Sequence, residues 1–254
     1  MAKMFFLIVA ALLGLGASGS YLPLEGREIH HSDEARYQRA LKYMQAKRYV
    51  LAWNALDEIG RVSQWQTRAQ FLKGYICFQW ERPEDAIQYF QTYQRQATVE
   101  LPYVDYYIAQ SFEALGRKQS ALDIYLSLSQ KADIDYVKVR SLRKSANLEA
   151  ELKQVKRAEE LRKTLIRDYP DFPELPQVKI ELAEYYESVG QLSPAMELYY
   201  DVMWLHPESG IAEKARKKLR DYSERKLWDM PKLGASEIYS YAERLYGVKE
   251  YGKA

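Results

Sequence analysis

Histidine, cysteine and paired carboxylates are the side chains that most often carry chemistry, and their spacing here matches no catalytic or metal-binding pattern. The three histidines are His30, His31 and His206, and none is followed three or four residues later by another histidine or by a cysteine. The sequence contains no glycine-rich phosphate loop, no Gly-x-Ser-x-Gly element and no His-Glu-x-x-His element. We therefore expect no catalytic residue, no metal site and no cofactor.

Carboxylates such as Glu159 and Glu160 are numerous, but they stand among lysines and arginines at positions typical of a helix surface. Solvated faces with ion pairs between residues i and i+4 account for most of them. Cys77 is the single cysteine, so the chain forms no internal disulfide. Its apolar neighbours in GYICFQW predict a buried and inert thiol.

The basic segment Lys214–Lys226 has two interpretations: a site for a polyanion, or the solvated face of a helix. A formal net charge of +2 gives no indication of a strongly charged partner. We expect no nucleic-acid partner, because the chain also begins with an export signal. An anionic cell-wall polymer is the polyanion that such a chain would meet.

The export signal is a short apolar segment at the N-terminus. Lys3 supplies a positive charge, and Met4–Leu15 is almost wholly apolar. Ala17-Ser18-Gly19 then places small residues where a signal peptidase cleaves, before Ser20. An uncleaved membrane anchor is the alternative, although a spanning helix needs about 20 apolar residues. We predict a signal peptide over residues 1–19 and a mature protein that is periplasmic or otherwise extracytoplasmic, with membrane contact only through this segment.

The elements that could position a binding site are helical hairpins, and residues 182–207 predict one of them. Leu182 and Tyr186 share the apolar face of a first short helix. Gly190 can end that helix in the left-handed conformation, and Pro207 stops the second helix. This order of small, aromatic, turn and proline residues resembles a tetratricopeptide repeat.

The same pattern recurs in phase along the chain. An alanine near the start of each predicted second helix returns at intervals of 34, 35, 37 and 37 residues, and a small residue precedes each alanine by twelve. The tetratricopeptide period is about 34 residues. We predict an all-α fold, a tetratricopeptide-like helical-hairpin solenoid that winds as a right-handed superhelix. The alanines are Ala52, Ala86, Ala121, Ala158, Ala195 and, after a longer gap, Ala254; the small residues are Ala40, Gly74, Ala109, Ala146, Ala183 and Ala242.

The remaining predicted segments flank or interrupt this array. We predict a linker over residues 20–31, the repeats over 32–207, an extra helix and loop over 208–234, and the start of a further, incomplete repeat over 235–254. We favour a fragment of a longer chain; a genuine end with a frayed last helix is the alternative. The fourth repeat unit departs most from the pattern, because Arg162 stands where a large apolar residue is expected.

The first helix of each pair is expected to line the concave side of the superhelix, with the residue three before the small position pointing into it. An aromatic-rich groove with arginine and asparagine could hold an extended peptide or a glycan, since tyrosine combines a large apolar area with a polar tip. The alternative is that the tyrosines fill the space between helices. The predicted groove residues are Tyr37, Phe71, Tyr75, Tyr103, Tyr106, Arg140, Arg143, Asn147 and Tyr239.

The order of units over residues 103–219 resembles the non-catalytic N-terminal arm of soluble lytic murein transglycosylases. The resemblance lies in YYIAQSFEALGRKQSALDIY, RDYP and YYDVMWLHPESGIAEKARKKL. It implies a helical arm that precedes a lysozyme-like domain cleaving peptidoglycan, and that domain has no counterpart in this sequence. Exported tetratricopeptide proteins of outer-membrane assembly and cell division share the same pattern.

We therefore predict a non-catalytic bacterial scaffold whose partner is a protein, a peptide or peptidoglycan. Two hypotheses remain open at this point. The chain is either the arm of a transglycosylase, or a stand-alone envelope assembly or cell-division coordinator protein.

Overall fold

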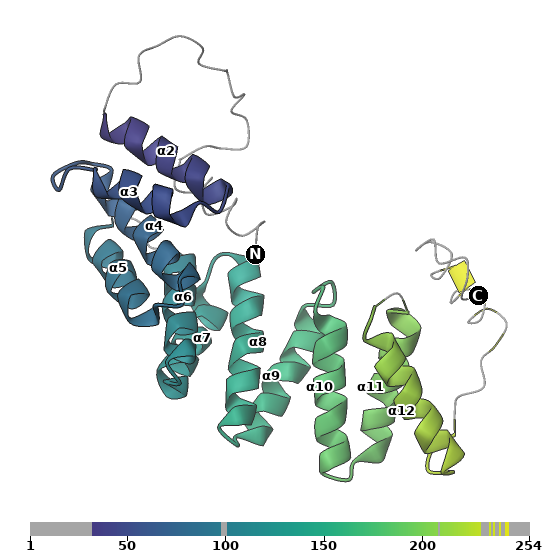
Figure 1. The fold of residues 1–254 in the computed structure, drawn as a ribbon. Coiled ribbons are helices and arrows are strands. Elements are labelled where there is room, and N and C mark those ends of the chain that lie inside the picture. The colour runs from purple at the N-terminus through teal and green to yellow at the C-terminus, as the bar shows by residue number, and fades with distance from the viewer. Residues whose placement is uncertain are drawn as a thin grey trace. The chain divides into compact units, whose positions relative to one another are not determined.

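The computed structural model describes residues 32–97, 101–207 and 209–229, with residues 234, 236, 239, 242 and 243 (Figure 1). The predicted signal peptide, the predicted linker and most of the predicted last repeat lie outside the described residues. Within the described ranges, all regular secondary structure is α-helical, which confirms the predicted all-α fold. The helices are α2 (Asp33–Gln45), α3 (Tyr49–Asp57), α4 (Gln66–Gln79), α5 (Pro83–Gln96), α6 (Pro102–Ala114), α7 (Lys118–Lys131), α8 (Asp135–Glu151), α9 (Val155–Asp168), α10 (Leu175–Ser188), α11 (Leu192–Leu205) and α12 (Ala212–Glu224).

Consecutive helices form antiparallel hairpins, as Figure 1 shows for α2 with α3 and α4 with α5. The pairs α6–α7 and α10–α11 pack in the same way, and α12 packs on α11. The chain divides into two compact units, Met1–Ser141 and Leu142–Ala254, with the boundary inside α8. No helix in the described part of the chain is both long and apolar enough to span a bilayer.

A residue with positive φ ends the first helix of each pair. The turns at Lys47, Glu81, Gly116, Lys153, Gly190 and Lys226 have φ angles of 56°, 56°, 71°, 62°, 76° and 55°. Left-handed backbone at this position lets the chain reverse direction after a helix. The turns are 34, 35, 37, 37 and 36 residues apart, so the repeat phase continues through the last of them.

The last turn changes the interpretation of the predicted extra helix. The helix itself is present as α12, but it ends in the same left-handed turn, at Lys226, and so occupies the place of a sixth first-type helix. Leu219 stands seven residues before this turn, where the earlier pairs have alanine or glycine. A repeat pattern that requires a small residue at this position therefore does not identify α12 as the first helix of a pair. Leu219 is fully buried, with Ala212 and Ala215 beside it on the same face.

Small residues allow close approach of the helices within each pair. Gly74 is the clearest case, because a Cβ atom added there would lie 2.8 Å from two ring carbons of Phe90. Ala109, Ala183 and Ala195 are also fully buried. The small residue that recurs in each unit thus marks a close contact between helices, most clearly at Gly74.

Two tyrosines form the same hydrogen bond in the third and fifth helical pairs. The Tyr125 hydroxyl donates to Glu113 (3.1 Å), and the Tyr199 hydroxyl donates to Glu187 (2.8 Å). Both rings are fully buried. Each hydroxyl bonds to a carboxylate twelve residues earlier on the partner helix, so part of the high tyrosine content serves the core rather than a binding surface.

Candidate functional site

Five of the predicted groove residues are buried. Tyr37 and Phe71 are 0% exposed, Tyr103 and Tyr106 are 3% exposed, and Tyr75 is 8% exposed. These rings were expected to line an open surface, and the structure corrects that expectation.

Aromatic packing within the first unit explains the burial. Phe71 contacts Phe90 and Tyr93 at ring-centroid distances of 5.8 and 5.7 Å. Tyr106 contacts Tyr125 at 5.5 Å in an edge-on arrangement. Edge-on and tilted ring pairs at these distances are favourable beyond the area they bury. The position three before the small residue therefore faces neighbouring helices, as in the alternative interpretation of the tyrosines.

Arg140 keeps partial exposure at the surface of the first unit. Its guanidinium lies over the ring of Tyr136, 4.9 Å from the centroid. Burial raises the pKa of the Tyr106 hydroxyl, and the charge of Arg140, together with a hydrogen bond from it, opposes that effect. Arg140 is thus a partly accessible cation held against aromatic rings.

Arg143 and Asn147 belong to a charged network in the second unit. Arg143 pairs with Glu174 and, at 3.4 Å, with Glu181. Arg162 lies 3.5 Å from the side-chain oxygen of Asn147 and 3.7 Å from Glu181. Burial lowers the pKa of Arg162, and the Glu181 charge opposes that effect. Both predicted residues are therefore engaged with other side chains.

Tyr239 is 66% exposed. It lies in the sparsely described C-terminal region, so the structure brings it together with none of the other predicted groove residues.

Trp65, a residue that the repeat pattern did not predict, organises a partly exposed polar site of the first unit. Trp65 immediately precedes α4, and its ring lies 5.1 Å from the ring of Tyr37. The guanidinium of Arg68 lies over the same indole, 5.0 Å from the centroid. We call Tyr37, Trp65 and Arg68 the Arg68 site. Trp65 and Arg68 are partly exposed, whereas Tyr37 is buried.

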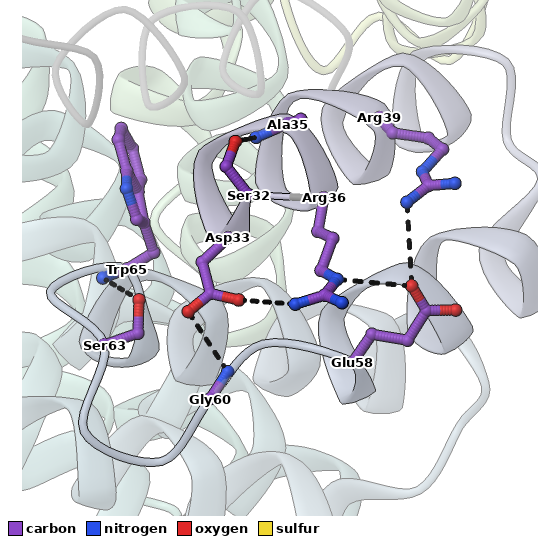
Figure 2. A network of polar contacts seen from close by, with 9 residues as sticks. All are labelled: Ser32, Asp33, Ala35, Arg36, Arg39, Glu58, Gly60, Ser63 and Trp65. Carbon is purple, nitrogen blue, oxygen red and sulfur yellow. Dashed lines mark hydrogen bonds and ion pairs between the residues drawn. The ribbon is translucent and has the colours of Figure 1, made fainter. Parts of the chain in front are cut away.

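The loop between α3 and α4 holds Trp65 in place. Figure 2 shows Asp33 of α2 between the two groups that it binds, the backbone N–H of Gly60 (3.3 Å) and the side chain of Arg36 (2.8 Å). The Ser63 hydroxyl oxygen then accepts a hydrogen bond from the Trp65 backbone N–H (3.2 Å). A hydrogen bond from Ser63 lowers the pKa of Asp33 most, with Arg36 next. These bonds fix the loop, and through it the start of α4.

Two further arginines of the first unit are already paired. Arg36 and Arg39 both reach the same carboxylate oxygen of Glu58, at 3.5 and 3.6 Å (Figure 2). Arg68 differs, because within the described ranges no carboxylate forms an ion pair with it. Among the residues that the structure describes, no carboxylate therefore offsets the positive charge of the Arg68 site.

The charge of Arg68 influences the pKa values of two phenols, those of Tyr37 and Tyr93. Burial raises the pKa of the Tyr37 hydroxyl strongly and that of Tyr93 as well. In both cases the Arg68 charge opposes the effect. Both hydroxyls therefore remain protonated at neutral pH and can serve as hydrogen-bond donors.

The sequence does hold a signal for this site. Trp65 and Arg68 are three residues apart, a spacing that places two side chains on one face of a helix. An arginine that follows an aromatic residue at this spacing can stack on its ring. Tyr136 and Arg140 are four residues apart and form the second such stack of the first unit.

Neither a metal centre nor a reactive thiol emerges from the described residues. No group of three or more histidine, cysteine, aspartate and glutamate side chains in these ranges is arranged to hold a metal ion. Cys77 is buried, and burial raises the pKa of its thiol to about 11. The thiol is therefore protonated at neutral pH, which makes it a poor nucleophile.

No protein-family model matches the sequence, and no curated protein matches it. Solved structures share the fold. YrrB, described as a TPR protein with an unusual peptide-binding site, aligns with a TM-score of 0.57 at 14% identity, over 74% of this chain and 93% of that chain. PilF of Pseudomonas aeruginosa aligns with a TM-score of 0.59 at 15% identity, over 85% of this chain and 91% of that chain.

A third solved structure is the C-terminal part of a TPR repeat-containing protein from Cytophaga hutchinsonii. It aligns with a TM-score of 0.62 at 14% identity, over 84% of this chain and 78% of that chain. Identities this low establish a shared fold only. The fold is a tetratricopeptide-like helical-hairpin solenoid, as the repeat phase predicted.

Proposed function

We propose that this chain is a non-catalytic scaffold that binds an extended peptide segment of a partner protein on the first-type helices of its repeats. The observation that carries the proposal is the Arg68 site, where a cation and an aromatic face lie together, partly exposed, at the start of α4. Tryptophan, tyrosine and arginine are the residues that most often dominate protein interfaces.

The fold supports the same function. Stacked helical hairpins present repeated surfaces along one chain, which suits an extended ligand. The structural relative YrrB is described as having a peptide-binding site, and this chain has the same hairpin architecture at 14% identity. This likeness supports a peptide as the ligand, and the Arg68 site is where we expect that peptide to bind.

Export outside the cytoplasmic membrane is part of the proposal, and it rests on the N-terminal sequence. Lys3, the apolar run Met4–Leu15 and the small residues before Ser20 support a signal peptide. A C-terminal fusion to alkaline phosphatase, which is active only outside the cytoplasm, tests this directly. We expect an active fusion for the whole chain and an inactive one after deletion of residues 1–19.

The second candidate function is the helical arm of a lytic murein transglycosylase, with peptidoglycan as the ligand. It rests on the sequence resemblance over residues 103–219. Pelleting of the purified chain with peptidoglycan sacculi would favour this candidate. Release of muropeptides by the chain alone, abolished by a single Glu→Gln change, would contradict the non-catalytic proposal.

Peptide binding is tested with an array of synthetic octapeptides probed with the purified chain. We expect a subset of peptides to bind and to lose affinity in the Arg68→Gln variant. Binding by no peptide on the array would contradict the proposed function.

A further inference from the structure

A second partly exposed aromatic surface lies at the other end of α4 from the Arg68 site. Trp80 ends this helix, and its ring lies 5.5 Å from the ring of Trp53 on α3. Trp53 also contacts Tyr89 edge-on at 5.6 Å, and the Lys73 ammonium lies over its ring, 5.3 Å from the centroid. Both tryptophans are partly exposed. Contacts with several side chains therefore hold two tryptophan rings at the protein surface.

Exposed apolar area continues from these rings along α3. Val50 stands three residues before Trp53, a spacing that makes the two side chains neighbours on a helix, and it is 62% exposed. Tyr49 precedes it and is partly exposed, with its hydroxyl 3.5 Å from the side-chain oxygen of Gln79. A single exposed aliphatic side chain is ordinary, whereas a contiguous apolar patch is typical of an interaction site. Val50 belongs to the second kind, because it extends an aromatic cluster.

Two cations stand at the edge of this patch, in the turn that precedes α3. Lys47 and Arg48 are exposed, and neither forms an ion pair with a residue that the structure describes. Lys42, in the last turn of α2, is a third exposed cation without such a pair. The exposed acids that follow Trp80 are Glu81 and Glu84. The free charges around the patch thus have a positive balance.

The other charges close to the tryptophans are paired internally. The Lys73 ammonium bonds to the Asp57 carboxylate at 2.8 Å, and Arg82 pairs with Asp85 at 2.6 Å. These pairs add no net charge, so a partner meets aromatic rings, an aliphatic side chain and the free cations. Tryptophan and tyrosine rings are enriched where a membrane meets water, since their apolar body and polar tip suit that boundary. Lysine and arginine beside them are attracted to anionic lipids.

We propose that this surface, which we call the Trp53 surface, docks on an anionic phospholipid bilayer. The rings and the valine side chain enter the headgroup layer, and the cations contact the lipid phosphates. Binding of this kind strengthens with buried apolar area and with attraction to anionic lipids, and the surface offers both. The Trp53 surface consists of Lys47, Arg48, Tyr49, Val50, Trp53 and Trp80.

The Trp53 surface is separate from the Arg68 site and does not depend on the proposed peptide ligand. Trp65 precedes α4 and Trp80 follows it, so the 14 residues of the helix lie between them. At a rise of about 1.5 Å per residue, the two tryptophans are about 22 Å apart along the helix. A bound peptide and a bilayer therefore contact different side chains. The sequence predicts membrane contact through residues 1–19 alone, and the Trp53 surface adds a second contact.

Flotation with lipid vesicles tests the proposal. The chain is used without residues 1–19, because the predicted signal segment is itself apolar and every described helix begins after it. The vesicles contain phosphatidylcholine alone or equal parts of phosphatidylcholine and phosphatidylglycerol. We expect flotation with the mixed vesicles and binding to phosphatidylcholine that is weaker by about tenfold. Absence of flotation with the mixed vesicles, or equal binding to both kinds, would overturn the inference.

Val50→Asp and Val155→Asp form a matched pair of variants. Both valines are exposed and stand in the first turn of the second helix of a pair, Val50 in α3 and Val155 in α9. An aspartate is favourable near a helix N-terminus, so neither change should unfold the protein. Val50→Asp should weaken binding to the mixed vesicles about tenfold, and Val155→Asp should change it by less than about twofold. Equal effects of the two variants would place the bilayer contact elsewhere and contradict the inference.

A fluorescent probe locates the contact. Cys77 is buried, and burial raises the pKa of its thiol, so a cysteine introduced in place of Val50 can be labelled selectively. A nitrobenzoxadiazole label at Val50→Cys should shift its emission to the blue on the mixed vesicles, because it enters an apolar layer. The same label at Val155→Cys should not shift. The reverse pattern would overturn the inference.

The cations are tested by the double variant Lys47→Gln with Arg48→Gln. Salt screens exposed charges, so binding of the unchanged chain to the mixed vesicles should weaken as salt is raised. The double variant should bind more weakly at low salt and lose most of this salt dependence. Salt dependence that persists in full would remove Lys47 and Arg48 from the surface and contradict the inference as stated.

Further outcomes separate this inference from the proposed function and from a protein partner. Arg68→Gln should bind vesicles as the unchanged chain does, and Val50→Asp should bind octapeptides as the unchanged chain does. Failure of the vesicle experiments therefore leaves the peptide-binding scaffold intact. A label at Val50→Cys that responds to an extract of envelope proteins, but not to vesicles, would assign the Trp53 surface to a protein partner and overturn the inference.

Discussion

The second and fourth helical pairs place different chemistry at the same repeat positions. In α4 and α5, these positions hold Phe71 and Phe90, which are fully buried and pack against each other. In α8 and α9, they hold Arg143 and Arg162, which pair with Glu181 of α10; Arg143 also pairs with Glu174, directly before α10. The comparison teaches that repeat phase decides which positions are enclosed, whereas residue type decides whether an enclosed position forms a packed core or a polar network.

The aromatic core of the second pair and the ion-pair network of the fourth pair are expected to contribute unequally to stability. A packed aromatic core gains free energy from area removed from water, and a cavity left in it is costly. A buried ion pair loses hydration energy that its Coulomb attraction only partly returns. Substitutions at equivalent positions of the two pairs should therefore have unequal effects.

The largest effect is expected from Phe90→Ala. The ring is 0% exposed and contacts Phe71 and Tyr107, so its loss leaves a cavity. We expect a cost of about 3–5 kcal/mol in the free energy of unfolding, measured by urea denaturation followed by circular dichroism. Phe112→Ala, at a partly exposed ring of the same unit, serves as the control and should cost clearly less.

Arg162→Met tests the fourth pair and should cost about 1–2 kcal/mol. The loss of stability is smaller than for Phe90→Ala, because Glu181 still pairs with Arg143 and accepts a hydrogen bond from Gln177 (3.1 Å). Addition of Glu181→Gln should recover part of the loss, since no carboxylate is then left underpaired. A loss for Arg162→Met as large as that for Phe90→Ala would contradict the distinction between the two pairs.

Gly74→Ala tests the close contact between α4 and α5 in the second pair. The new Cβ would lie 2.8 Å from the Phe90 ring, and the overpacking should outweigh the gain in helix propensity by about 1 kcal/mol. In the Phe90→Ala background the clash is absent, so the same substitution should stabilise the protein. Equal effects of Gly74→Ala in both backgrounds would show that the ring does not limit this position.

The smallest expected effect concerns the turns of the third and fourth pairs. Gly116 and Lys153 occupy the same place with φ of 71° and 62°, but only glycine adopts this conformation without strain. Lys153→Gly should stabilise the protein by about 0.5 kcal/mol, and Gly116→Ala should destabilise it by about 1 kcal/mol. Thermal melts of both variants measure these changes. A lower melting temperature for Lys153→Gly than for the unchanged protein would contradict backbone strain at this turn.

The sequence predicted the fold well, because tetratricopeptide-like hairpins leave a residue pattern with a fixed period. Gly74 and Ala183 were placed correctly on buried helix faces, since close packing at these positions tolerates only small side chains. The phase of α12 was missed, because Leu219 fills the position where the pattern requires a small residue. Its left-handed turn at Lys226 becomes evident only in the backbone conformation.

The site was less predictable than the fold. The period located Tyr37, Phe71 and Tyr106 on the first helix of each pair, but it could not tell which direction within the stack their rings face. That direction depends on aromatic partners from other helices, such as Phe90 and Tyr125. Trp65 was overlooked because it lies in the turn before α4, outside the repeat positions that the period defines.

Binding of a ligand at the Arg68 site can be tested directly with the five tryptophans of the chain. Uniform labelling with 5-fluorotryptophan gives five fluorine NMR resonances, which are assigned by single Trp→Phe substitutions. Titration with the octapeptide that binds most tightly should shift the resonance of Trp65 and leave those of Trp204 and Trp228, in the second unit, at their original frequencies. A titration that saturates with the Trp65 resonance unmoved, while another tryptophan responds, would contradict the claim and place the ligand elsewhere.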